Sequence, residues 1–161
     1  MSDLHLEFGP LSLEPAGEDV IALAGDIGIF TDGVGWADEV ARSLDVPVVM
    51  IAGNHEFYRN REHRNHSVVS TFDALSEAAR KTAGRVMFLE RGTAKIAGVR
   101  FIGATLWTDF NLFGSPVLAK HRAVEAMNDY RAIAFSPRED FTPDVAAREH
   151  AKAIGYISEA L

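Results

Sequence analysis

Two short, continuously apolar segments, each followed directly by glycine, constrain the fold of this chain more than any other feature of its sequence. They cover residues 20–24 and 47–52, and the residues that follow are Gly-Asp in one case and Gly-Asn in the other. Segments of this length without polar alternation are typical of buried parallel strands. We therefore expect two strands of a parallel sheet with polar loops at their carboxyl ends.

The segments around these strands carry regular patterns. Apolar residues recur every three or four positions over 33–44 and again over about 66–82, which is the spacing of one face of an α-helix. Residues 86–89 have the composition of a strand. Residues 93–96 and 99–102 flank an Ala-Gly pair, which is the pattern of a hairpin with a two-residue turn.

Two further helices are predicted in the last third of the chain. One covers 117–133, and the other runs from Thr142, where Thr-Pro-Asp is a typical helix start, to residue 161. This order of elements predicts an α/β fold with mixed sheets, which are parallel at first and then gain antiparallel strands. A length of 161 residues fits a single domain, 1–161.

We expect this domain to be incomplete at both ends. Only two residues precede Asp3, whereas a strand typically has about five, and the last helical pattern reaches Leu161 without a C-cap glycine. The alternative is a short first strand and a frayed last helix. An incomplete fold would expose apolar surface where further strands and helices dock.

Composition excludes several classes of function. The formal net charge of −7 argues against an extended nucleic-acid surface or a surface for anionic membranes. The chain has no cysteine, so disulfides, thiolate metal sites and a cysteine nucleophile are excluded. The apolar runs are too short to cross a bilayer and the first residues have no signal-peptide pattern, so we expect a cytoplasmic location.

Residue types that bind metals gather beside the predicted strands. Asp3 and His5 are two residues apart, so their side chains would project to the same side of an extended segment. Asp26 and Asn54 follow the two apolar runs, and oxygen and imidazole donors suit hard or borderline divalent metals. Two ions bridged by a carboxylate such as that of Asp26 would activate a water for attack on phosphorus.

His55 and Glu56 follow Asn54 in the same loop. The imidazole of His55 is placed to protonate a leaving oxygen or to bind a phosphoryl group. The Glu56 carboxylate would then fix the tautomer of His55.

Three blocks of this sequence resemble the first three blocks of the calcineurin-like metallophosphoesterases. They are residues 2–7 (Ser-Asp-Leu-His-Leu-Glu), 25–28 (Gly-Asp-Ile-Gly) and 53–56 (Gly-Asn-His-Glu). Residues 103–110 resemble a stretch found in bacterial members of that family, and Trp107 within it would either line a substrate cleft or pack in the core.

The resemblance covers essentially the whole chain and implies a partial four-layer α/β/β/α sandwich with a dinuclear metal site. It implies that Asp3 and His5 hold the first metal, that Asp26 bridges the two, and that Asn54 holds the second. It also implies that His55 assists catalysis. Mn, Fe, Zn, Ni and Co are all suitable metals for such a site.

The later blocks of the family, a histidine after a strand and then Gly-His-x-His, do not occur in this sequence. We therefore expect this chain to bind at most one ion of the pair. One hypothesis is a phosphoesterase that hydrolyses a phosphate mono- or diester of a small molecule with a two-metal-activated water. The other is a truncated or degenerate, non-catalytic family member that acts as a binding module, and the missing histidines favour this second hypothesis for the 161-residue chain.

A basic stretch follows the third block. It contains Arg59, Arg61, His63, Arg64 and His66. These side chains could contact a phosphate of the substrate. Charged runs usually face water, however, so we favour a solvated loop and helix start.

Overall fold

The computed structural model describes residues 1–61 and 63–161. Its first half alternates strand and helix, with short 3-10 turns beside the predicted polar loops. The elements are η1 (Leu6–Phe8), β1 (Ile21–Ala24), α1 (Asp32–Leu44), β2 (Val48–Ile51), η2 (His55–Phe57), α2 (Val68–Lys81) and β3 (Val86–Phe88). The three strands form one parallel sheet in the order β1-β2-β3, in which Val48 of β2 pairs with Ile21 and with Val86.

The second half contains a hairpin, a second small hairpin and three helices among the described residues. The elements are β4 (Gly92–Ile96), β5 (Val99–Gly103), α3 (Pro116–Ala126), α4 (Asp129–Ala132), β6 (Ala134–Ser136), β7 (Glu139–Asp140) and α5 (Pro143–Ala160). Both hairpins are antiparallel. The predicted α/β class with mixed sheets is confirmed.

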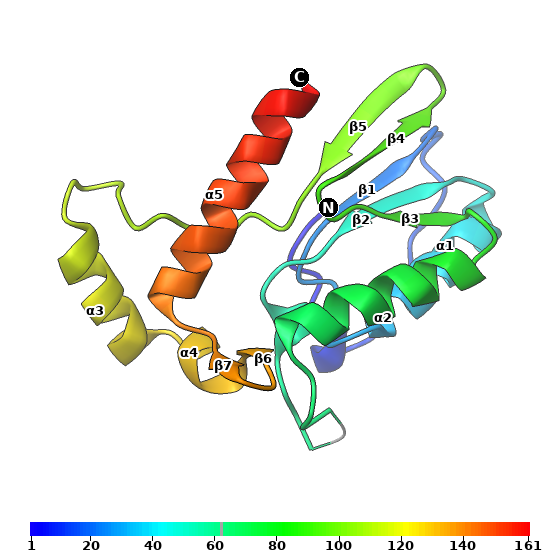
Figure 1. The fold of residues 1–161 in the computed structure, drawn as a ribbon. Coiled ribbons are helices and arrows are strands. Elements are labelled where there is room, and N and C mark those ends of the chain that lie inside the picture. Colours follow the sequence, from blue (N-terminus) through cyan, green and yellow to red (C-terminus); the bar gives the residue numbers. More distant parts are fainter. Residues whose placement is uncertain (62) are drawn as a thin grey trace.

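The elements form layers (Figure 1). Helices α1 and α2 cover one face of the parallel sheet, the β4–β5 hairpin lies over the other face, and α5 lies beyond the hairpin. Strand β5 contacts both β2 and α5, which connects the layers. This layer order is that of the expected α/β/β/α sandwich.

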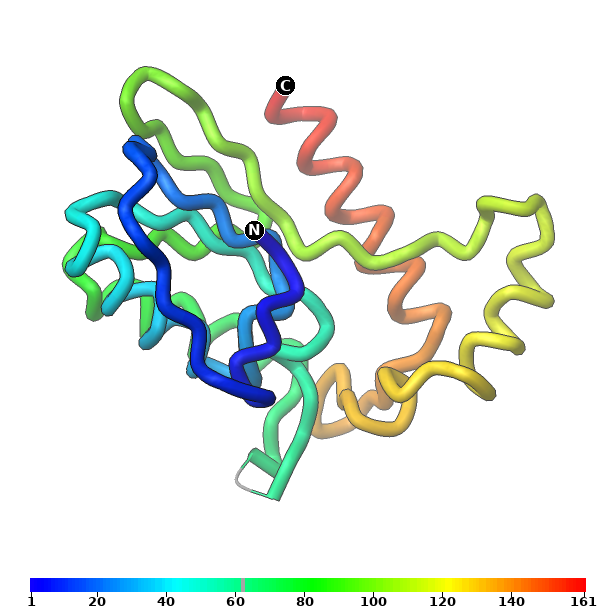
Figure 2. Tube along the Cα trace, turned by 180° about the vertical axis from the view of Figure 1, so that it is seen from behind, coloured from blue at the N-terminus to red at the C-terminus, as the bar shows by residue number. Residues whose placement is uncertain are grey.

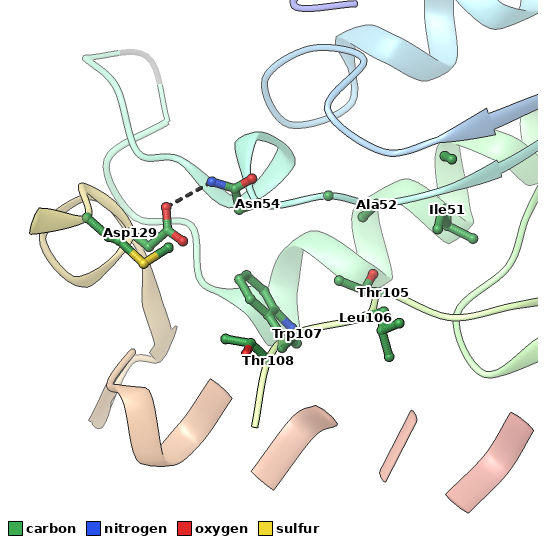
Figure 3. A pocket seen from close by; sticks show the side chains of 11 residues that line it. Ile51, Ala52, Asn54, Thr105, Leu106, Trp107, Thr108 and Asp129 are labelled. Carbon is green, nitrogen blue, oxygen red and sulfur yellow. Dashed lines mark hydrogen bonds between the residues drawn. The ribbon is translucent and has the colours of Figure 1, made fainter. Parts of the chain in front are cut away.

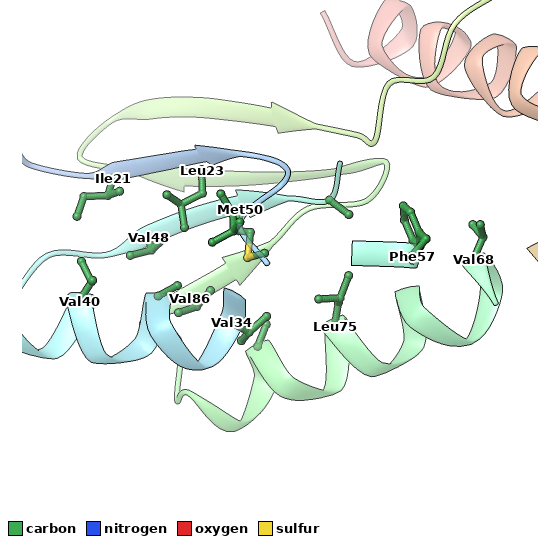
Figure 4. Packing of buried hydrophobic residues seen from close by; sticks show 14 of the residues in the cluster. Ile21, Leu23, Val34, Val40, Val48, Met50, Phe57, Val68, Leu75 and Val86 are labelled. Carbon is green, nitrogen blue, oxygen red and sulfur yellow. The ribbon is translucent and has the colours of Figure 1, made fainter. Parts of the chain in front are cut away.

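The main core lies between the parallel sheet and helices α1 and α2 (Figure 4). Val48 and Met50 of β2 are fully buried, and Val34 of α1 and Leu75 of α2 lie on the helix side of this core. In both helices the buried residues recur every three or four positions, which places them on one face. The two helices predicted from this spacing are confirmed, with small shifts at their ends.

Local sequence signals also define the β4–β5 turn and the start of α5. Ile96 pairs with Val99, and both turn residues, Ala97 and Gly98, have positive φ angles, as the preferred hairpin turns require. The side chain of Thr142 accepts a hydrogen bond from a backbone N–H in the first turn of α5. Both predictions are confirmed.

The prediction of one helix over 117–133 is wrong. The chain forms α3 and α4 instead, and Met127 between them has an extended backbone. The cause is tertiary, because the Asp129 side chain is buried and accepts hydrogen bonds from a distant loop. The short β6–β7 hairpin that follows has no regular apolar alternation and was not predicted.

The N-terminal segment lies alongside β1 (Figure 2). The Met1 amino group donates to the Ala22 carbonyl, and the Ala24 N–H donates to the Met1 carbonyl. Asp3 and His5 both have positive φ angles, so the expectation that they lie in an extended segment is wrong. Among the described residues, no helix is both long enough and apolar enough to cross a bilayer.

Candidate metal centre

The loops that follow β1 and β2 are in direct contact. A Cβ atom at Gly53 would lie 2.2 Å from Oδ1 of Asp26, and a Cβ atom at Gly25 would lie 2.6 Å from the Gly53 nitrogen. Only glycine therefore fits at these two positions. The close approach places the Asp26 carboxylate against the second loop, where Oδ1 accepts a hydrogen bond from the His55 N–H at 2.9 Å.

The Glu56 carboxylate joins the two loops from inside the protein. Only 1% of Glu56 is exposed. Its Oε2 atom accepts from the backbone N–H groups of Gly53 at 2.8 Å and Asp26 at 3.1 Å. Its Oε1 atom accepts from those of Ile27 at 2.8 Å and Gly28 at 3.4 Å. Burial raises the pKa of the Glu56 carboxyl, while the N–H groups of Ile27 and Gly53 act in the opposite direction.

Asp3, His5 and Asp26 converge at these loops. One possible ligand atom from each lies within 4.8 Å of those of the other two. The backbone N–H of Asp3 donates to the Gly25 carbonyl and that of His5 to the Asp26 carbonyl, at 3.1 and 3.0 Å. These bonds fix the N-terminal segment to the loop after β1. Two carboxylates and an imidazole at this spacing fit a divalent metal ion.

Glu7 contacts both histidines of the site. Its Oε1 atom accepts from Nδ1 of His55 at 2.7 Å and from Nδ1 of His5 at 3.2 Å. An ionised carboxylate only accepts, so Nδ1 carries the proton in both rings and Nε2 is left for other partners. Burial alone would raise the pKa of the Glu7 carboxyl, but hydrogen bonds from its own backbone N–H and from the two histidines lower it.

The prediction that Glu56 fixes the tautomer of His55 is wrong. The four backbone N–H groups occupy both oxygens of Glu56. Glu7 holds the His55 ring instead. Tyr58 stacks on the same ring, with 4.4 Å between the ring centroids.

Asn54 is oriented by Tyr58 and Asp129. Its Nδ2 atom donates to Oδ1 of Asp129 at 2.8 Å and to the Tyr58 hydroxyl at 3.2 Å, and that hydroxyl donates to the same Asp129 oxygen at 2.7 Å. Burial and the bond to Asp129 raise the pKa of the Tyr58 hydroxyl well above its usual range, so it remains a donor. Because the amide nitrogen is used, the carbonyl oxygen of Asn54 is the atom left for a metal.

A cleft of about 350 Å³ opens beside Asn54 (Figure 3). Asn54 and Asp129 line it on one side, and Trp107 and neighbouring residues line it from the segment after β5. Trp107 also packs against Phe57 and Phe141, with ring centroids 5.7 and 4.5 Å apart. Trp107 thus packs in the core and also lines this cleft; that the cleft takes the substrate stays a prediction.

The structure adds three residues to the predicted set: Glu7, Tyr58 and Asp129. Glu7 stands two residues after His5, so the sequence carried a weak signal for it. Tyr58 and Asp129 are 71 positions apart and no sequence pattern links them. The roles of Asp3, His5, Asp26, Asn54 and His55 in metal binding and catalysis stay predictions.

Comparison with known proteins finds similarity both in sequence and in fold. The sequence model of the calcineurin-like phosphoesterases matches residues 3–148. The fold is similar to that of the phosphopantetheinyl hydrolase PptH from Mycobacterium tuberculosis, with a TM-score of 0.66 and 23% sequence identity. The match covers 100% of this chain but only 62% of the length of PptH. No match was found among curated proteins.

Proposed function

Because this chain belongs to the calcineurin-like phosphoesterase family, we propose that it hydrolyses a phosphate mono- or diester with the help of divalent metal. The convergence of Asp3, His5 and Asp26 within 4.8 Å carries this proposal. Residues 1–161 would form one domain of the family. The substrate would be a phosphorylated small molecule or a diester, as the name of the structural neighbour, a phosphopantetheinyl hydrolase, also suggests.

The donor groups divide into two sets. Asp3 and His5 would hold one ion, the Asn54 carbonyl would hold the second, and the Asp26 carboxylate would be shared. Divalent ions bound there supply a water of lowered pKa and polarise the phosphoryl oxygens. We expect tight binding of at most one ion, because the sequence lacks the imidazoles of the family's later blocks.

His55 would act on the leaving oxygen. Nδ1 of its ring donates to Oε1 of Glu7, with 2.7 Å between the two atoms. Nε2 is therefore the nitrogen that would give or take a proton. The stacked Tyr58 ring and the bond from the His55 N–H to Asp26 restrict the imidazole to one orientation. A fixed donor is needed because proton transfer requires hydrogen-bond distance to the leaving oxygen.

The test is hydrolysis of aryl phosphate mono- and diesters by the 161-residue chain with added Mn²⁺. We expect activity that EDTA removes and that Asp26→Ala abolishes, because loss of the shared carboxylate disperses the metal. His55→Ala should lower kcat by about 10²- to 10⁴-fold, the usual contribution of general acid catalysis. This loss should shrink for a 4-nitrophenyl leaving group, which needs little protonation.

Two variants serve as controls. Asp73→Ala removes an exposed carboxylate on α2, and His121→Ala removes an exposed imidazole on α3; both should keep the parent activity. Equal rates in excess EDTA, or an Asp26→Ala variant as fast as the parent, would refute the metal-dependent mechanism. Mn²⁺ binding without any hydrolysis would favour the non-catalytic binding module.

A further inference from the structure

A second pocket, of about 660 Å³, lies away from the metal-binding side chains. It is formed by the loop that follows η2 and by the β6–β7 hairpin, which lie beside each other (Figure 1). Arg59 connects this loop to the end of α4, just before the hairpin, since its backbone N–H and its Nε–H both donate to the Ala132 carbonyl, at 3.0 and 3.2 Å. These two bonds hold the loop beside the segment that leads into the hairpin.

Three arginines are among the residues that line this pocket, namely Arg59, Arg64 and Arg138. Within the described ranges, none of them has a carboxylate at ion-pair distance. The Nε atoms of Arg59 and Arg64 donate to backbone carbonyls, and their terminal nitrogens have no hydrogen-bond partner in the part of the chain that the structure describes. Most other arginines of the chain are held by carboxylates, namely Arg42, Arg80, Arg85, Arg91, Arg122 and Arg148.

The acidic residues of the pocket do not neutralise these arginines. Glu139 lines the pocket, but its carboxylate is paired with Arg148 at 2.9 Å. Asp140 is the other lining carboxylate, and it is exposed. Among the lining residues that the structure describes, positive charge therefore exceeds negative charge, in a chain whose formal net charge is −7.

His66 adds an unused donor or acceptor to the same wall. Its ring lies against that of Phe30 at a tilt of 33°, with 3.6 Å between centroids. Its Nδ1 atom is buried and has no hydrogen-bond partner among the residues that the structure describes. A polar atom buried without a partner is rare, and a bound ligand is one way to satisfy it.

We propose that this pocket binds a phosphoryl group, supplied by a second phosphate on the substrate. Planar guanidinium groups bind phosphate oxygens in a bidentate manner, and several of them together select a multiply charged oxyanion. The pocket is joined to the metal centre through Tyr58, which precedes Arg59 and contacts Asp129 and Asn54. The inference that a phosphoryl group binds here depends only on the residues of the pocket. The inference that this group belongs to the substrate rests on the proposed function.

Binding is tested without metal, by titrating inorganic pyrophosphate into the full chain in EDTA and measuring heat or amide shifts. We expect saturable binding that weakens with added salt, as interactions between charges do. Arg64→Gln combined with Arg138→Gln should lower the affinity by about tenfold or more. Arg59 is kept because its Nε–H donates to the end of α4, which leads into the hairpin.

The matched control is Arg100→Gln combined with Arg122→Gln, which changes the net charge equally on β5 and α3 and should leave the affinity unchanged. Thermal melting of Arg138→Gln alone should match the parent, because the Arg138 side chain has no partner among the described residues. No binding of pyrophosphate, or the same loss in the test and control variants, would overturn the pocket assignment.

Hydrolysis separates this inference from the proposed function. With Mn²⁺, the parent chain should have a lower KM for a nucleoside 3′,5′-bisphosphate than for the 5′-monophosphate. In the Arg64→Gln, Arg138→Gln variant the two KM values should be equal, while kcat for the monophosphate should not change. A preference that persists in this variant would overturn the substrate assignment. Pyrophosphate binding in a chain that hydrolyses neither compound would refute the catalytic proposal and leave the phosphoryl-binding pocket standing.

Discussion

At the scale of single residues, one buried carboxylate sets the geometry of the candidate centre. Glu56 accepts hydrogen bonds from two loops that are separated by more than twenty positions in the sequence, and both of its oxygens are used. Asp26 and Asn54 lie in these loops. Glu56 therefore positions potential metal ligands without itself being one.

Replacing Glu56 by Gln should destabilise the fold. One side-chain oxygen becomes an NH₂ group that faces two backbone N–H donors, which leaves those donors unpaired. Each unsatisfied buried group costs about 1–3 kcal/mol, so we expect the free energy of unfolding to fall by about 2–4 kcal/mol. Urea denaturation followed by circular dichroism measures this, with the exposed Glu159→Gln on α5 as control. Equal midpoints for both variants would contradict the role of Glu56.

At the scale of elements, an ion pair connects α1 to the start of β3. Asp38 of α1 accepts from Arg85 Nε at 2.6 Å and from Arg42 at 2.6 Å. The hydrogen bond from Arg85 is the main cause that lowers the pKa of the Asp38 carboxyl, and Arg42 adds to it. The pair fixes α1 against the edge of the sheet on which its buried face packs.

The stability contributed by this pair should depend on pH. Because the folded-state pKa of Asp38 is lowered, its contribution is present above the ordinary carboxyl pKa, about 4, and is lost as pH falls through the folded value. At pH 7 we expect Asp38→Asn to be less stable by about 1 kcal/mol or less, as for other partly exposed pairs. The difference should vanish in acid unfolding experiments once the pH lies below the lowered pKa that Asp38 has in the folded state.

The control for this measurement is Asp73→Asn, which removes an exposed carboxylate on α2. Its stability should differ little from that of the parent at every pH. If the difference in the free energy of unfolding between the parent and Asp38→Asn stayed constant from neutral to acid pH, Asp38 would act by packing and not by charge.

At the scale of the whole molecule, one region exposes much apolar surface. Leu112, Phe113, Val117 and Leu118, around the start of α3, are 87%, 90%, 83% and 60% exposed. Contiguous apolar surface of this kind marks an interface or an aggregation liability. The sequence predicted exposed apolar surface where further strands and helices would dock, and that these residues form that surface stays a prediction.

This surface should make the isolated chain self-associate. We expect concentration-dependent association in sedimentation velocity, and Leu112→Ser combined with Phe113→Ser should reduce it, because burial of large apolar side chains drives association. Val99→Ser on β5, where the parent side chain is 56% exposed, is the control and should have little effect. A parent chain that remains monomeric at high concentration would contradict this prediction.

Much of the fold was predictable because its signals are local. The apolar runs of β1 and β2, the helical spacing of α1 and α2, and the Ala97-Gly98 turn each depend on residues that are close in sequence. Side-chain periodicity and turn conformation decide such elements before any long-range contact forms. The break between α3 and α4 escaped this reasoning because its cause lies outside the segment.

The sequence by itself predicted which residues would supply metal donors, and it determined the order of the strands beside which they lie. The tertiary structure alone decided what holds those donors in place. Hydrogen bonds join Asn54 to Asp129, which is 75 positions away in the sequence, His55 to Glu7, 48 positions away, and Glu56 to Ile27, 29 positions away. Buried polar groups take the partners that packing brings within hydrogen-bond distance, and no short-range pattern in the sequence encodes that choice.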